Sequence, residues 1–87
     1  MKDAEKLLLQ KYENSDLIYE GSLEKGDYLY GWFNEKDSST LDGVHINRIN
    51  LKTNEIEENF GIPAVMEWGI NLNDFKMKKE ASLASSL

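Results

Sequence analysis

Apolar residues recur along this chain at two different spacings, which separate its expected helices from its expected strands. From Asp3 to about Glu13 they return every three or four residues, the period of a helix with one apolar side. Between residues 17 and 60 apolar and polar residues tend to alternate, which is typical of strands. Short polar turns divide this region into expected strands at residues 17–23, 27–34, 44–51 and 55–60.

The strand expected at residues 27–34 is apolar on both of its faces. Successive side chains of a strand point to opposite sides, so Tyr28, Tyr30 and Trp32 share one face. A leucine and a phenylalanine occupy the other face. Such a strand is either central in its sheet and covered on both sides, or covered once with an aromatic face open to a partner. A chain of this size needs its large side chains inside, which favours the core interpretation.

Two irregularities are expected inside the strands. In residues 44–51 the apolar positions are even-numbered at first and odd-numbered later. A β-bulge near Asn47 and Arg48 would bring these positions to one face. In the first strand, Gly21 marks either a bulge or the close approach of another segment. The apolar residues around this glycine are expected to share a face: Leu17, Tyr19 and Leu23.

Turn residues define the hairpins. Gly26 supplies a positive φ between the first two strands. Residues 51–56 are expected to contain a hairpin loop of three to four residues, with Asn54 in the left-handed conformation. Glu58 has the same parity as the inward residues of the last strand, which indicates that this strand is short or lies at the sheet edge.

The C-terminal part of the chain returns to helical signals. Pro63 suits the first position of a short helix that Gly69 would close, and Asn73 suits the cap of a last helical piece. Residues 81–87 are small and polar, and a flexible tail is expected there. The pattern predicts one α+β domain over residues 1–80: an N-terminal helix, a four-stranded antiparallel meander and C-terminal short helices, with the helices packed on one sheet face.

The charge of the chain is distributed unevenly. The formal net charge is −6, and residues 27–60 hold seven acidic residues against three basic ones. This balance disfavours direct binding of nucleic acid and favours a basic partner. The chain has no cysteine, which excludes disulfides and thiolate metal ligands and favours a reducing cytoplasm. No apolar run is long enough to span a membrane as a helix.

Catalytic and metal-binding motifs find no support in the sequence. His45 is the only histidine, so a zinc site built on histidines is excluded, and an exposed strand position is expected for it. Asp37 and Asp42 flank a Ser/Thr-rich loop, but the alternating ligands of a calcium-binding loop are missing. The glycines form neither a phosphate-binding loop nor a nucleophile elbow. The sequence therefore predicts no enzymatic activity and no cofactor.

These observations predict a small acidic domain that binds another protein. Its partner-binding residues would come from the aromatic face and from the acidic loop and hairpin: Tyr28, Tyr30, Trp32, Asp37, Asp42, Glu55, Glu57 and Glu58. In size and charge alone, the chain is similar to bacterial and phage inhibitor or immunity proteins. The alternatives are a module that binds a small molecule with the aromatic face, a homodimeric structural protein in which this face meets its own copy, and an enzyme built around the histidine.

Overall fold

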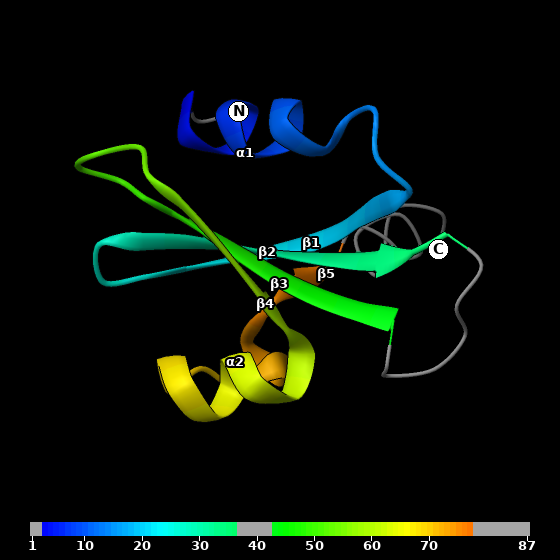
Figure 1. The fold of residues 1–87 in the computed structure, drawn as a ribbon. Helices are drawn as coiled ribbons and strands as arrows, with labels where there is room; N and C mark the ends of the chain where they lie inside the picture. Colours follow the sequence, from blue (N-terminus) through cyan, green and yellow to red (C-terminus); the bar gives the residue numbers. More distant parts are fainter. Residues whose placement is uncertain (1–2, 37–42, 78–87) are drawn as a thin grey trace, which may run out of the picture.

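The structure, a computed structural model, describes residues 3–36 and 43–77, and the tail predicted at residues 81–87 lies outside them. The strands form one antiparallel sheet in the order β4-β3-β2-β1-β5 (Figure 1). The α+β class is confirmed, with five strands in place of the expected four. In chain order the elements are α1 (Asp3–Tyr12), β1 (Leu17–Lys25), β2 (Tyr28–Glu35), β3 (Val44–Asn50), β4 (Ile56–Phe60), α2 (Gly61–Trp68), η2 (Leu72–Asp74) and β5 (Lys76–Met77).

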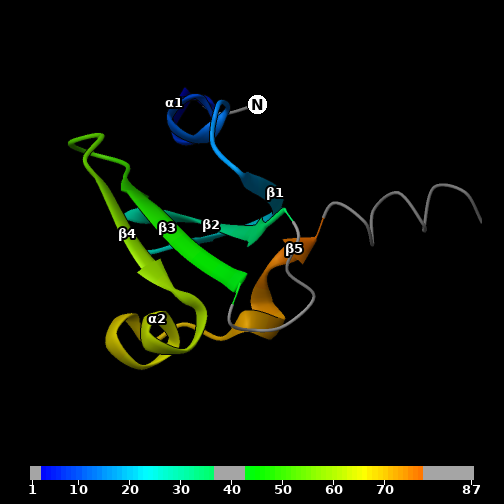
Figure 2. The ribbon, with the colours of Figure 1, turned by 45° about the vertical axis from the view of Figure 1, so that its right-hand side comes forward.

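The two α-helices lie on opposite faces of the sheet instead of sharing one face. Figure 2 shows α1 on one side of the strands and α2 on the other. One core cluster, which includes Tyr30, Ile46 and Ala64, lies on the α2 side. A second cluster, which includes Leu8 and Phe33, lies on the α1 side. Because β2 is the third of five strands and is covered twice, its sequence is apolar on both faces.

The two apolar phases of β3 serve these two cores, so the β-bulge predicted near Asn47 and Arg48 is wrong. β3 pairs in regular register with β2 and with β4. Val44 and Ile46 pack into the cluster on the α2 side, and Ile49 packs into the cluster on the α1 side. A strand that is covered on both faces needs no bulge to bury both sets of side chains.

A β-bulge is present in β1 instead, next to Gly21, where the sequence predicts either a bulge or the close approach of another segment. The register with β2 shifts between Tyr19 and Gly21. Because of this shift, Tyr19 packs on the α1 side opposite Phe33, whereas Leu23 packs on the α2 side, and the prediction that they share a face is wrong. A Cβ on Gly21 would lie 2.6 Å from the carbonyl oxygen of Lys76, so this glycine also allows the close approach of β5.

Both predicted turn residues adopt the expected conformation. Gly26 has a φ of 61° and Asn54 a φ of 65°. The N–H of Asn50 donates to the carbonyl oxygen of Glu55 at 2.8 Å, so residues 51–54 form the loop between β3 and β4. β4 is short and lies at the sheet edge, in agreement with the parity of Glu58.

The C-terminal segment follows its prediction only in part. α2 begins at Gly61, so Pro63 occupies its third position, where a backbone N–H would have no partner within the helix. Gly69 ends α2 in the left-handed conformation, as predicted. The helical piece expected after Asn73 is replaced by η2 and β5, and the side chain of Asn71 caps η2 by accepting the Asn73 N–H at 2.9 Å.

Candidate functional site

The aromatic face of β2 lies beneath α2 and the segment that follows it. Tyr30 is 4% exposed, and its ring centre lies 5.9 Å from that of Trp68 on α2. Trp32 is partly buried, and its ring meets Phe75 edge to face at 5.6 Å. Tyr28 packs against the same core cluster. This face therefore belongs to the core, and Tyr30 does not contribute an exposed ring.

Arg48 completes the aromatic face in a way that the sequence analysis missed. Its guanidinium carbon lies 3.9 Å from the ring centre of Tyr28 and 4.2 Å from that of Trp68. The guanidinium also donates to both carboxylate oxygens of Glu57, at 3.1 and 3.3 Å, and the side chain is 14% exposed. The one signal in the sequence was parity, because Arg48 shares its strand face with the apolar Ile46. Stacked cations attract aromatic rings, so Arg48 holds α2 onto the sheet.

The acids of the β4 hairpin differ in how open they are to a partner. Glu57 is already paired with Arg48, which balances its charge within the chain. Glu55 and Glu58 are exposed and form no salt bridge with any residue in the described parts of the chain. Asp37 and Asp42, which were also predicted to bind a partner, lie outside the described residues.

His45 is part of a small surface cluster. Its Nε2 lies 3.0 Å from Oε1 of Glu35, and its ring centre lies 5.0 Å from that of Phe60. The side chain is 20% exposed, so it is less open than the sequence predicted. Within residues 3–36 and 43–77, no group of three or more histidine, cysteine or acidic residues is arranged to hold a metal ion. The cluster contains a base and a carboxylate, and the Ser/Thr-rich loop between Asp37 and Asp42 lies outside the described residues.

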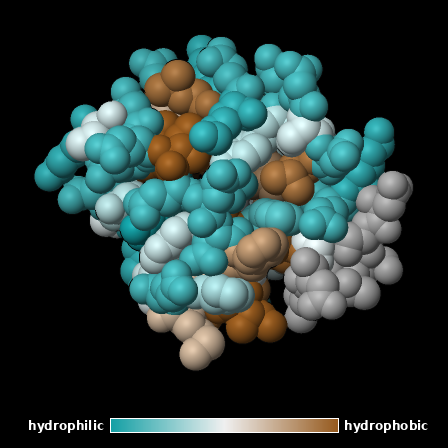
Figure 3. All heavy atoms as spheres, viewed as in Figure 1, coloured by the Kyte–Doolittle hydropathy of each residue, from teal (hydrophilic) through white to brown (hydrophobic). Residues whose placement is uncertain are grey.

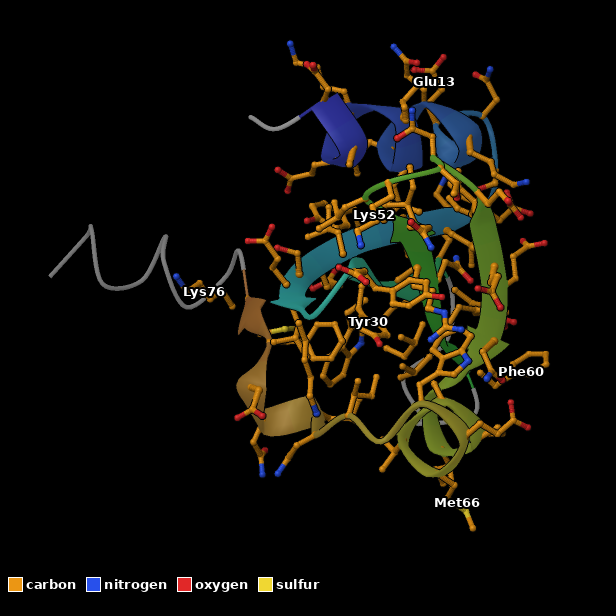
Figure 4. All side chains as sticks on the ribbon, turned by 90° about the vertical axis from the view of Figure 1, so that its left-hand side faces the viewer. Glu13, Tyr30, Lys52, Phe60, Met66 and Lys76 are labelled. Atoms are coloured by element: carbon orange, nitrogen blue, oxygen red, sulfur yellow. The ribbon has the colours of Figure 1, made fainter. Side chains whose placement is uncertain are left out.

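Large apolar side chains are exposed where β4 continues into α2. Phe60, Ile62 and Met66 are 56%, 61% and 79% exposed. Figure 4 shows Phe60 and Met66 directed away from the body of the molecule, and Figure 3 shows apolar atoms reaching the surface near α2. Ile62 and Met66 are one helical turn apart, so they share a side of α2. We call these residues, with the two open acids of the hairpin, the edge surface: Glu55, Glu58, Phe60, Ile62 and Met66.

A groove lies at the other edge of the sheet from this surface, next to β1 and β5. Its volume is about 640 Å³, and it is open to solvent. The lining is mixed, with apolar, hydroxyl and charged side chains: Glu5, Ser22, Leu23, Glu24, Leu29, Asp74 and Lys76. A groove of this volume is large enough for a small molecule.

Comparison of the chain with protein-family models, with curated protein sequences and with solved structures finds no significant match. None of the helices in the described part of the chain has the length and apolar character needed to cross a membrane.

Proposed function

We propose that this chain is a non-enzymatic protein-binding domain that contacts a basic partner with its edge surface. The observation that carries the proposal is the exposure of Phe60, Ile62 and Met66, each more than half open to solvent. Ile62 and Met66 share one side of α2, and Phe60 is the N-cap residue that directly precedes this helix. Contiguous exposed apolar surface marks interaction sites more often than isolated apolar residues do. They would serve as anchors, because buried apolar and aromatic contacts supply most of the affinity of an interface.

The charge beside these residues supports the choice of a basic partner. Glu55 and Glu58 have no salt-bridge partner among the described residues, and Glu67 on α2 only accepts a hydrogen bond from Asn59, at 3.1 Å. Carboxylates without a basic partner attract a basic surface from a distance and raise its rate of association. Compared with the prediction from sequence, the acidic hairpin is retained, and Phe60 replaces the buried aromatic residues of β2 as the anchor.

The test compares partner capture by three forms of the protein. Wild type, a Phe60→Ser/Met66→Ser double variant and an Ile18→Ser variant would each be used as bait in native-host lysate, at about 50 and about 500 mM salt. Ile18 is the matched control, because it is an exposed apolar residue (44%) on β1. A partner held by wild type and by Ile18→Ser at low salt, and lost by the double variant, is the expected result. Equal capture by all three forms would contradict the edge surface.

Binding of a small molecule in the groove beside β1 is the second candidate function. The volume of about 640 Å³ and the carboxylates of Glu5, Glu24 and Asp74 favour a cationic compound. A panel of cationic metabolites would be screened by thermal shift against wild type and Asp74→Asn. A rise in melting temperature that the substitution removes would favour this function, and no rise with any compound would remove it.

A further inference from the structure

We propose that the basic partner adds a strand to the free edge of β4. This inference rests on the proposed function, since it specifies how the edge surface is bound. β4 is the last strand on its side of the sheet, and within residues 3–36 and 43–77 no strand lies beyond it. An edge of this kind presents unpaired backbone groups that an extended segment can join.

The hydrogen bonds of the hairpin identify which backbone groups face outward. The N–H of Asn50 donates to the Glu55 carbonyl, so this pair is a hydrogen-bonded one. Hydrogen-bonded and non-hydrogen-bonded pairs alternate along antiparallel strands. The register with β3 then turns the N–H and C=O groups of Ile56, Glu58 and Phe60 away from the sheet. The N–H of Phe60 agrees, because it donates to Oδ1 of Asn59 at 2.8 Å and not to β3.

The same hydrogen bonds limit the length of the segment. Asn59 occupies the N–H of Phe60, and α2 begins at the next residue. Ile56 and Glu58 are therefore the outward residues left for pairing. The added strand is short, and side-chain contacts with the neighbouring edge surface must supply the rest of its affinity.

The side chains along β4 favour a basic segment over a second copy of this chain. Antiparallel pairing of two β4 strands would place Glu57 and Glu58 of one copy beside the same acids of the other, and like charges opposite each other are unfavourable. Glu58 and Phe60 lie two residues apart on one face of β4. A complementary strand therefore carries a lysine or arginine and an apolar residue two positions apart.

The test uses two variants at one position, together with a defined peptide. Glu58→Ala and Glu58→Pro both remove the carboxylate, but only proline removes the outward N–H. Proline is tolerated at an edge strand when its nitrogen faces outward. The probe is acetyl-Lys-Thr-Val-Thr-Lys-amide, with acetyl-Glu-Thr-Val-Thr-Glu-amide as the charge control. Binding is measured by NMR titration up to about 1 mM peptide.

We expect the basic peptide to bind wild type, the acidic peptide to fail, and Glu58→Pro to bind about tenfold more weakly than Glu58→Ala, because one backbone hydrogen bond is lost. Equal affinity of the two variants would overturn strand addition, as would the absence of binding to wild type. The proposed function would still be judged separately, by the capture experiment with the Phe60→Ser/Met66→Ser bait.

A second measurement keeps the inference testable if Glu58→Pro does not fold. Hydrogen exchange of wild-type amides is followed with and without the basic peptide. The expected result is slower exchange at Ile56 and Glu58, with no change at Glu57, whose N–H faces β3. Unchanged exchange at Ile56 and Glu58 with the peptide bound would overturn strand addition.

Discussion

Both faces of the sheet bury polar side-chain atoms, but the hydrogen bonding of these atoms differs between the two faces. On the α2 side, Arg48 has a bidentate carboxylate partner and stacks against two aromatic rings. On the α1 side, Asn47 is 1% exposed, and neither atom of its amide makes a hydrogen bond with a described residue. The hydroxyl of Tyr12 on α1 is also buried, beside the carboxylate of Glu58. Asn47 and Arg48 are thus adjacent in β3, but Arg48 has hydrogen-bond partners and the amide of Asn47 has none among the described residues.

This difference shows where the fold gains stability and where it loses it. A paired and stacked charge contributes to the stability of the face that it occupies. A buried amide without a partner costs about 1–3 kcal/mol of folding free energy. The buried amide of Asn47 lies next to the edge surface, because Asn47 pairs with Glu58 across β3 and β4. The α1 side of β3 and β4 is therefore the less optimised part of the sheet.

The largest effect is expected from removing the partnered cation. Arg48→Met keeps most of the packing volume but loses the stacked charge and the two hydrogen bonds to Glu57, so we expect the free energy of unfolding to fall by roughly 2 kcal/mol. Unfolding would be measured with urea, because guanidinium would compete for the aromatic rings. Glu57→Gln is the control, and its smaller loss of about 1 kcal/mol separates the ion pair from the stacking. Equal losses in the two variants would show that stacking contributes nothing.

Local features of this fold could be predicted from sequence because they depend on near neighbours. The positive φ values of Gly26 and Asn54, the left-handed end of α2 at Gly69 and the edge position of β4 follow from residue type and spacing. The bulge at Gly21 was one of two alternatives for that glycine, whereas the bulge predicted in β3 is absent. The parity of the apolar residues in β3 predicts a bulge only if one face of the sheet is buried. A second core on the α1 side makes two apolar phases compatible with a regular β3.

The candidate site was predicted less completely for a related reason. The acids of the hairpin were visible as charge, but the pairing of Glu57 with Arg48 depends on the register between β3 and β4. The exposure of Phe60 and Met66 depends on where α2 begins and which side it turns to the sheet. Neither property is determined by the local sequence, so the sequence predicts an anchor among the aromatic residues of β2.

A smaller effect, of opposite sign, is expected on the α1 side. Asn47→Leu keeps a branched side chain and removes an unpaired amide, so we expect the free energy of unfolding to rise by about 1 kcal/mol. Urea unfolding would be compared with that of Asn47→Asp, which should be destabilised because it buries a charge. A loss of stability in Asn47→Leu would mean that the amide contributes to the fold, and the contrast between the two faces would then disappear.

The smallest effect concerns the pH dependence of the α1 side. The pKa of Tyr19 is raised from 10.0 to about 12, chiefly by burial. A hydrogen bond with Ser22 opposes this rise, whereas Glu5, whose Oε2 accepts the Tyr19 hydroxyl at 2.7 Å, adds to it. The pKa of Tyr12 is raised as well, first by burial and then by Glu58.

A raised pKa means that the folded state holds the tyrosine proton more tightly than the unfolded state does. The stability that Tyr19 contributes is therefore complete below pH 10.0 and is lost as the pH rises toward about 12. Tyr19→Phe should lower the free energy of unfolding at neutral pH by less than about 1 kcal/mol, through loss of the bond to Glu5. Above pH 10.0 its urea midpoint should fall less steeply than that of wild type. Parallel curves for the two proteins would show that this hydroxyl does not titrate differently on folding.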